Sequence, residues 1–214
     1  MLRTTLTQAT QYVMQKNHLV QPHASSLEIL VGQLAGLPGQ PVTTPVLAAR
    51  ARLPTVVPSD VAGAPLITSL LMRSALYQVP RIQFVNWYAA TARQRNQTLN
   101  AELRLWGIET NVEIERLGDK ILDVLDRQPA TIEEISDRLP AALVRELNQT
   151  SRGGRVSTTT NVSLALRWLI SAGRLVVSNA ADDWWIKRLV YHRLDWTCPE
   201  LDLTNLPAEA EAQK

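Results

Sequence analysis

The stretch from Leu147 to Ala181 reads LNQTSRGGRVSTTTNVSLALRWLISAGRLVVSNAA, with four arginines and no aspartate or glutamate. Its first part, residues 151–160, is a loop-like run of glycine, hydroxyl-bearing and arginine residues. Hydroxyl and guanidinium groups are suited to phosphate oxygens. A positive field of this kind, without a single acid, is typical of a surface that faces nucleic acid.

The second part of the stretch predicts a helix followed by a β-hairpin. Apolar residues recur at helical spacing over residues 162–171, and Thr160 or Asn161 can cap the start of that helix. Gly173 lies where a left-handed residue often ends a helix. Residues 175–177 and 184–186 are strand-like and predict the two arms of the hairpin.

Upstream of this stretch the chain predicts two more helices. Residues 118–127 have an apolar face, and Thr131 with Glu134 forms a capping-box pattern for a short helix ending near Leu139. The order is therefore helix, helix, helix, hairpin, which is the order of a winged helix-turn-helix unit. In such a unit the third helix enters the major groove of DNA.

The predicted third helix offers little for reading bases. Its expected exposed positions are Asn161, Ser163, Arg167 and Ser171. Of these, only Arg167 is a strong reader of base edges. The alternative for Arg167 is a surface ion pair with the acidic segment 101–146. We therefore expect DNA binding through phosphates, with little sequence choice, and the expected DNA-binding residues are Arg152, Arg155, Arg167, Arg174, Lys187, Arg188, Arg50, Arg52 and Arg73.

The first hundred residues predict a second helical unit. Helices are expected over residues 3–17, from the Ser25-Ser26-Leu27-Glu28 capping pattern onward, over 44–53, from Ser59 or Asp60 to Leu71, and over 81–98. Residues 74–79 are expected to be extended. The fold class is thus mainly α with small β-hairpin wings, as tandem winged helix-turn-helix units.

Charge is distributed in blocks along the chain. Residues 1–100 carry eight Lys/Arg and two acids, 101–146 carry eleven acids and six bases, and 147–193 carry seven bases and two acids. We expect an N-terminal unit over 1–100, an acidic helical connector over 101–116, a second unit over 117–198 and a tail over 199–214. Two basic blocks indicate two DNA-facing units.

Several classes of protein are disfavoured by the sequence. The longest apolar runs are far too short to span a membrane, and the N-terminus has no continuous apolar core of a signal peptide. The single cysteine, Cys198, excludes an intramolecular disulfide, and we interpret it as a structural thiol in a cytoplasmic, nucleoid-associated protein. We expect no metal ion and no cofactor.

Several short segments resemble one known family. These segments are Gly36–Gln40 (GLPGQ), Leu47–Pro54 (LAARARLP), Leu71–Pro80 (LMRSALYQVP), Ser163–Val177 and Tyr191–Trp196. In this order and spacing they resemble the winged-helix family that contains the AlkZ-like DNA glycosylases. The resemblance implies duplex DNA as partner and removal of bulky or crosslinked alkylated bases as activity.

The resemblance also implies a catalytic loop. Family members carry Gln-x-Gln or Gln-x-Asp, whose two side chains position a water for attack at the glycosidic carbon. This chain has Gln40 at the second position, our candidate catalytic residue, but Pro38 at the first. Tyr77 replaces the family's histidine in the following strand, whereas Arg73 matches. The alternative is that Gln40 is an ordinary loop residue.

Three functions remain open at this point. The chain is a monofunctional DNA glycosylase, a non-catalytic DNA-binding or regulatory module, or a protein-interaction module built on its acidic block and tryptophans. The family's members usually continue into a third winged-helix unit that shares the DNA cleft. A homodimer that rebuilds such a cleft is therefore one further expectation.

Overall fold

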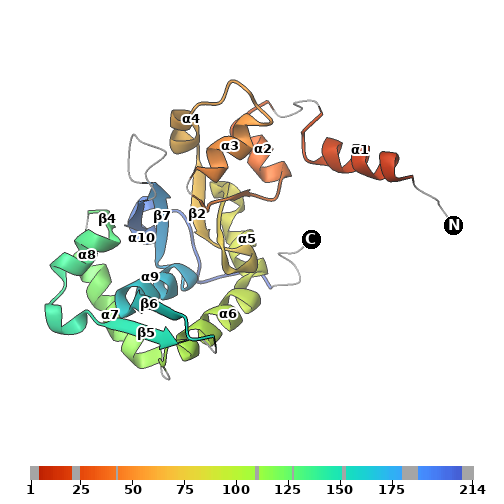
Figure 1. The fold of residues 1–214 in the computed structure, drawn as a ribbon. Coiled ribbons are helices and arrows are strands. Elements are labelled where there is room, and N and C mark those ends of the chain that lie inside the picture. The colour runs from red at the N-terminus through yellow and green to blue at the C-terminus, as the bar shows by residue number, and fades with distance from the viewer. Residues whose placement is uncertain are drawn as a thin grey trace.

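The computed structural model describes residues 5–20, 25–41, 43–108, 111–126, 128–150, 153–179 and 188–208. Helices dominate, and short antiparallel hairpins complete the fold, so the predicted mainly α class is confirmed (Figure 1). The α-helices are α1 (Leu6–Lys16), α2 (Leu27–Gln33), α3 (Thr44–Arg50), α4 (Pro58–Gly63), α5 (Phe84–Ala90), α6 (Ala92–Leu105), α7 (Asn111–Val124), α8 (Ile132–Arg138), α9 (Asn161–Ser171) and α10 (Leu194–Thr197). Single 3₁₀ turns are η1 (Met72–Ser74), η2 (Arg81–Gln83) and η3 (Ala141–Leu143).

Within the described residues, strands from both halves of the chain form one six-stranded antiparallel sheet in the order β1-β3-β2-β7-β8-β4. The strands are β1 (Leu37–Pro38), β2 (Leu66–Leu70), β3 (Leu76–Pro80), β4 (Ala130–Thr131), β7 (Leu175–Asn179) and β8 (Leu189–Arg193). The halves join where Thr68 of β2 pairs with Val177 of β7. The expected unit boundaries stay a prediction, but the hairpins of the two halves share this sheet.

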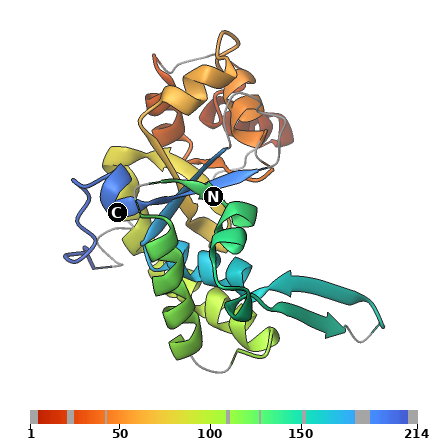
Figure 2. The same cartoon turned by 90° about the vertical axis from the view of Figure 1, so that its left-hand side faces the viewer.

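A separate two-stranded hairpin, β5 (Glu146–Thr150) with β6 (Val156–Thr160), extends away from the body (Figure 2). A loop is expected over residues 151–160 from the sequence, and that expectation is wrong for β6. The overlooked signal is the segment from Val156 to Thr160, four of whose five residues are β-branched, behind a glycine pair. Gly154 has a φ of +76°, which permits the turn between the strands.

Local capping signals predicted several helix starts correctly. Ser26 Oγ accepts a hydrogen bond from the Ile29 amide at 3.2 Å and begins α2. Thr131 and Glu134 form the expected capping box, and the bond from the Thr131 amide at 2.8 Å is the main reason that the pKa of the Glu134 carboxyl lies below its usual value. Thr160 caps α9.

Three element boundaries differ from expectation. The helix expected over 81–98 is instead η2, α5 and α6, because the chain bends at Thr91. The helix expected to reach Leu71 ends at Gly63, and β2 follows. The second arm of the C-terminal hairpin is β8, whereas residues 184–186 lie outside the described part of the chain.

Three apolar clusters hold the described elements together. The largest surrounds α9 and takes residues from α6, α7, α8 and one face of β2, β3 and β7. A second cluster joins α5 and the C-terminal segment to the opposite face of the sheet, through residues such as Ile67, Val79 and Val176. The third packs α2, α3 and α4 against Leu37 and Leu66. No helix in the described ranges is both long and apolar enough to cross a membrane.

Arg95 of α6 is buried, with 2% of its area exposed, and ties the first half of the chain to the end of α9. Its Nε donates to the Ser171 carbonyl at 3.1 Å, and Nη1 donates to the Tyr88 carbonyl and to Thr91 Oγ1, both at 2.9 Å. The guanidinium also lies 3.8 Å from the Tyr88 ring centroid. A carbonyl at a helix C-terminus carries partial negative charge, which stabilises this cation.

Replacing Arg95 by alanine is expected to lower the free energy of unfolding by about 3 kcal/mol, because a buried side chain and its charge-assisted bonds are lost together. Urea denaturation followed by circular dichroism measures the change. Arg93 is exposed on the same helix, and Arg93→Ala is the matched control, with an expected change below about 0.5 kcal/mol. Equal stability of the two variants would contradict the role given to Arg95.

Candidate DNA-binding surface and catalytic loop

The loop that ends at Gln40 is attached closely to strand β3. The Gly39 amide donates to the Leu76 carbonyl at 2.7 Å, which extends the β1–β3 pairing by one residue. A Cβ on Gly39 would lie 3.1 Å from the Leu76 backbone, so the close approach depends on glycine. Gln40 follows directly and is exposed. The candidate residue is therefore presented from a defined backbone position.

Strand pairing brings together the two positions at which this chain departs from the family pattern. Pro38 of β1 lies directly opposite Tyr77 of β3. Residues directly opposite each other in an antiparallel pair point to the same face, with Cβ atoms about 4.5–5.5 Å apart. Pro38 is exposed, and as an edge-strand residue it needs no amide hydrogen for the sheet.

The predicted DNA-binding residues of the first half have different environments. Arg50 at the end of α3 and Arg73 in the β2–β3 turn are exposed. Arg52 is half-buried and donates to the Asn17 carbonyl through Nε and to the Ala48 carbonyl through Nη1, both at 2.7 Å. Arg52 thus connects the segment after α1 to α3. Burial lowers the pKa of its guanidinium.

Helix α9 is not the exposed recognition helix that the sequence suggested. Asn161 and Ser171 are each 3% exposed, and Ser163 and Arg167 are half-buried. The prediction of an exposed polar face is therefore wrong. Ser171 contacts α6 and Asn161 contacts the segment before β5, and an amphipathic pattern cannot show how many neighbours a helix has.

Arg167 is paired with Glu102 of α6, with 2.9 Å between Arg167 Nε and Glu102 Oε2. This is the alternative stated from the sequence, because Glu102 belongs to the acidic block. About a third of the Arg167 side chain is exposed. The Glu102 carboxylate therefore balances its charge at the surface of the protein.

The β5–β6 hairpin carries the exposed part of the acid-free stretch. Arg155 is exposed next to the turn, while Arg152 lies outside the described residues. Across the two strands, Thr158 Oγ1 donates to Asn148 Oδ1 at 2.7 Å. Asn161 fixes the base of the hairpin, because its Oδ1 accepts from the Arg145 amide and its Nδ2 donates to the Leu143 carbonyl.

Two more predicted residues lie around the C-terminal hairpin. Arg174 is exposed between α9 and β7. Arg188 is exposed, and its Nη2 lies 3.9 Å from Glu133 Oε2, a long contact between two solvated groups. Such surface pairs contribute about 1 kcal/mol or less. Lys187 lies outside the described residues.

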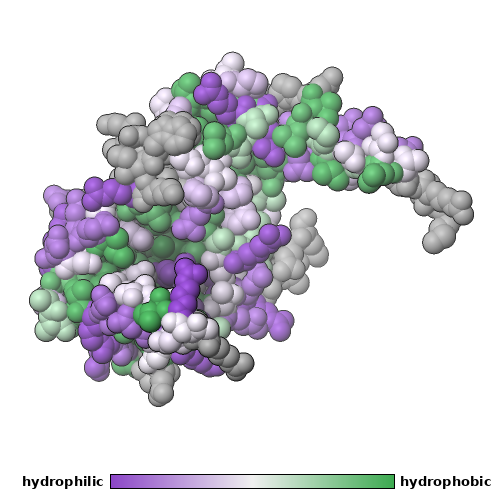
Figure 3. Space-filling model, viewed as in Figure 1, coloured by the Kyte–Doolittle hydropathy of each residue, from purple (hydrophilic) through white to green (hydrophobic). Residues whose placement is uncertain are grey.

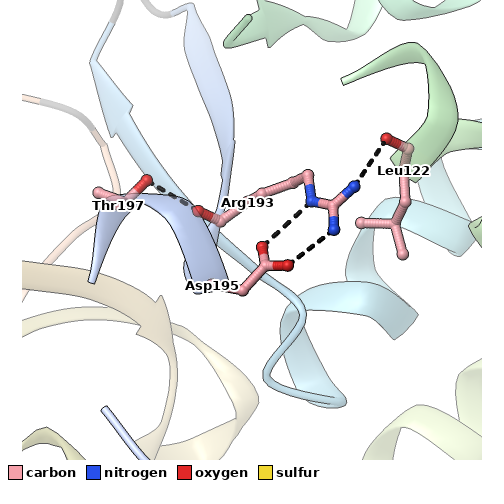
Figure 4. Close-up of polar contacts among 4 residues, drawn as sticks. All are labelled: Leu122, Arg193, Asp195 and Thr197. Atoms are coloured by element: carbon pink, nitrogen blue, oxygen red, sulfur yellow. Dashed lines mark hydrogen bonds and ion pairs between the residues drawn. The ribbon is translucent and has the colours of Figure 1, made fainter. Parts of the chain in front are cut away.

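Arg193, which the sequence analysis did not single out, has a structural role (Figure 4). Its Nε and Nη2 donate to the two oxygens of Asp195 at 3.1 and 2.7 Å, and Nη1 donates to the Leu122 carbonyl at 3.4 Å. The bond from Arg193 is the main reason that the pKa of the Asp195 carboxyl is lowered. The guanidinium also lies 4.4 Å from the Trp196 ring centroid. This group joins β8 and α10 to α7.

The surface has a hollow (Figure 3) and a groove, each lined by both apolar and hydrophilic side chains. The face in Figure 3 is hollowed near its centre, with apolar side chains at the bottom and hydrophilic side chains around it. An open groove of about 780 Å³ lies between α7 and the segment before β5. Leu117 and Leu143 line this groove, and its charged residues include the ion pair of Glu113 with Arg145. No sequence motif indicated this groove.

A family profile and one solved structure are similar to this chain. The profile of the family described as DNA glycosylase AlkZ-like matches residues 31–213. The solved structure of Streptomyces sahachiroi DNA glycosylase AlkZ superimposes with a TM-score of 0.68 at 17% sequence identity, covering 99% of this chain and 55% of that one. No curated protein sequence gives a significant match.

The structural likeness shows a shared fold, and this chain spans just over half the length of the Streptomyces protein. The family profile covers most of the chain and includes Gln40, the sheet, α9 and the β5–β6 hairpin. The resemblance found in the sequence is confirmed: the chain belongs to the AlkZ-like family of DNA glycosylases.

Proposed function

We propose that this protein grips duplex DNA largely through phosphates and excises alkylated bases, using Gln40 to orient the attacking water. Membership of a DNA glycosylase family supports DNA as the partner. The observation that carries the proposal is the loop Gly36–Gln40, which the Gly39–Leu76 bond holds against β3 while Gln40 stays exposed. A fixed backbone with a free carboxamide suits the positioning of a water molecule.

The chemistry needs little from the protein when the leaving base is cationic. Water forms a bond to the glycosidic carbon, the bond from that carbon to the base nitrogen breaks, and the electron pair neutralises an N7-alkylated purine. One water proton passes to solvent, and the other stays on the new hydroxyl group of the sugar. The side-chain oxygen of Gln40 accepts one O–H of the water and thereby directs its lone pair toward the carbon.

Grip on DNA is assigned to exposed cations on both halves of the chain. Arg50 and Arg73 lie in the first half, and Arg155, Arg174 and Arg188 lie in the second. Arg167 is left out of this set because Glu102 balances its charge. Phosphate contacts of this kind hold a duplex without a sequence code. Roles for Arg152 and Lys187, a homodimer and a nucleoid location stay predictions.

Binding of a random duplex is expected to weaken steeply with salt, with a slope near −0.9 per neutralised phosphate in a plot of log affinity against log salt concentration. Arg155→Ala and Arg174→Ala are each expected to reduce that slope by about one unit. Fluorescence anisotropy with a labelled duplex measures the slope. Arg167→Ala is the control and should leave it unchanged. Affinity without salt dependence would contradict the phosphate grip.

Excision is expected to depend on Gln40. With enzyme in excess over a duplex that contains N7-methylguanine, the wild type should release the base, and Gln40→Ala should slow release by about 100-fold because water orientation is lost. Gel electrophoresis after alkaline cleavage counts the abasic sites. Gln97→Ala, an exposed glutamine on α6, is the control. Absence of product with the wild type, or full activity of Gln40→Ala, would refute this function.

The second candidate function is a non-catalytic DNA-binding module. One observation favours it: Pro38 has no side-chain acceptor, so the family's paired water contacts are incomplete at that position. A protein of this kind would show the salt-dependent binding described above and release no base. The two experiments together therefore separate the two functions.

A further inference from the structure

Pro38 has no side-chain acceptor, and the sheet shows which side chain lies beside it. Tyr77 lies directly opposite Pro38, and on its other side Tyr77 pairs with Ser69 of β2. The three side chains therefore form one row across three strands on a single face of the sheet. Gln40 follows Pro38 by two residues on the same segment. The side chain of Tyr77 is thus the strand-paired neighbour of position 38, where the family's glutamine is absent.

The Tyr77 hydroxyl is available for hydrogen bonding. The ring is half-buried and packs against the second apolar cluster, which fixes its position. Within the described ranges, the hydroxyl has no hydrogen-bond partner, and it is not among the buried unpartnered atoms, so it reaches solvent. Ser69 Oγ, the next hydroxyl in the row, is buried without a partner. A phenol hydroxyl both donates and accepts, as a bound water requires.

The other polar neighbour on β3 lies on the wrong side. Gln78 pairs with Leu37 and Thr68, so it belongs to the opposite face of the sheet from Pro38. Successive residues of a strand point to opposite faces. Tyr77, unlike Gln78, therefore points to the same face of the sheet as Pro38, where the second contact to the water is needed.

We infer that Tyr77 is a positioning residue whose hydroxyl holds the attacking water together with Gln40, in place of the side chain that Pro38 lacks. This inference rests on the proposed glycosylase function. The Tyr77 oxygen accepts one O–H of the water, and the Gln40 side-chain oxygen accepts the other. Tyr77 keeps its own proton, and the bonds formed and broken at the glycosidic carbon are those given above.

The test uses the full chain and a duplex with N7-methylguanine under single-turnover conditions. Tyr77→Phe removes only the hydroxyl and is expected to slow base release by about 100-fold. The affinity for undamaged duplex and the thermal midpoint should stay at wild-type values, which a structural role would not allow. Tyr191→Phe, at another half-buried tyrosine of the same sheet, is the control and should keep the wild-type rate.

Rescue provides the decisive comparison. Pro38 is exposed on an edge strand, so Pro38→Gln can be introduced there without burying a polar group. In the Tyr77→Phe background it should restore base release at least tenfold, and in the wild type it should change the rate little. A Tyr77→Phe protein as fast as wild type, or one that Pro38→Gln does not rescue, would overturn the inference.

The outcomes also distinguish this inference from the proposed function. One outcome is an active wild type, with Gln40→Ala slow and Tyr77→Phe as fast as the wild type. That result would support the glycosylase function and rule out the role of Tyr77. An inactive wild type that becomes active on Pro38→Gln shows that Tyr77 does not replace the missing group. Inactivity of both proteins rejects the glycosylase function and the inference together.

Discussion

The bond from the Arg95 guanidinium to the Ser171 carbonyl is the buried polar contact that joins the two halves, beside the β2–β7 pairing and the shared apolar clusters. Ser171 ends α9, and its carbonyl also accepts the Tyr88 hydroxyl at 2.8 Å, so α5 and α6 are fastened to one point of the second half. Gly173 has a φ of +68°, and a side chain there would lie 3.0 Å from the Tyr88 hydroxyl. Glycine is therefore needed beside the contact.

This contact also influences which parts of the molecule are exposed and can meet DNA in the proposed function. Helices α6, α7 and α8 all contact α9, which lies at the centre of the largest apolar cluster with most of its side chains buried. Acids of the block 101–146 lie close to basic residues of the second half, as in Glu102 with Arg167 and Glu133 with Arg188. The exposed cations of the proposed DNA-binding set lie on the β5–β6 hairpin, around the C-terminal hairpin and in the first half. Such a distribution favours binding to DNA phosphates over recognition of a base sequence.

Features that depend on a few neighbouring residues could be predicted from the sequence. The Thr131–Glu134 capping box, the start of α9 at Thr160 and the left-handed Gly173 all appear as expected. Each depends on hydrogen bonds or backbone angles within about one helical turn. The family resemblance around Gln40 also held, because it depended on the order of short motifs.

Features that depend on distant contacts could not be predicted. The sequence offered an ion pair of Arg167 with the acidic segment as an alternative, but it could not identify Glu102, 65 residues away, as the partner. The apolar pattern of α9 also gives no sign that α6 contacts its polar side. The opposition of Pro38 and Tyr77 follows from strand register, which the sequence alone leaves open. The β5–β6 hairpin was overlooked because its arginine, glycine and hydroxyl residues were interpreted only as a phosphate-binding loop.

The central claim is the proposal that α9 is a structural support and that exposed cations outside it bind DNA, with the β5–β6 hairpin and the Gln40 loop at the interface. Hydrogen–deuterium exchange of the full chain, with and without an undamaged duplex at low salt, tests it most directly. The account predicts slower exchange on DNA binding at residues 36–40 and 153–160, with residues 163–171 already slow and unchanged. New protection confined to residues 163–171, with none in the hairpin, would contradict it.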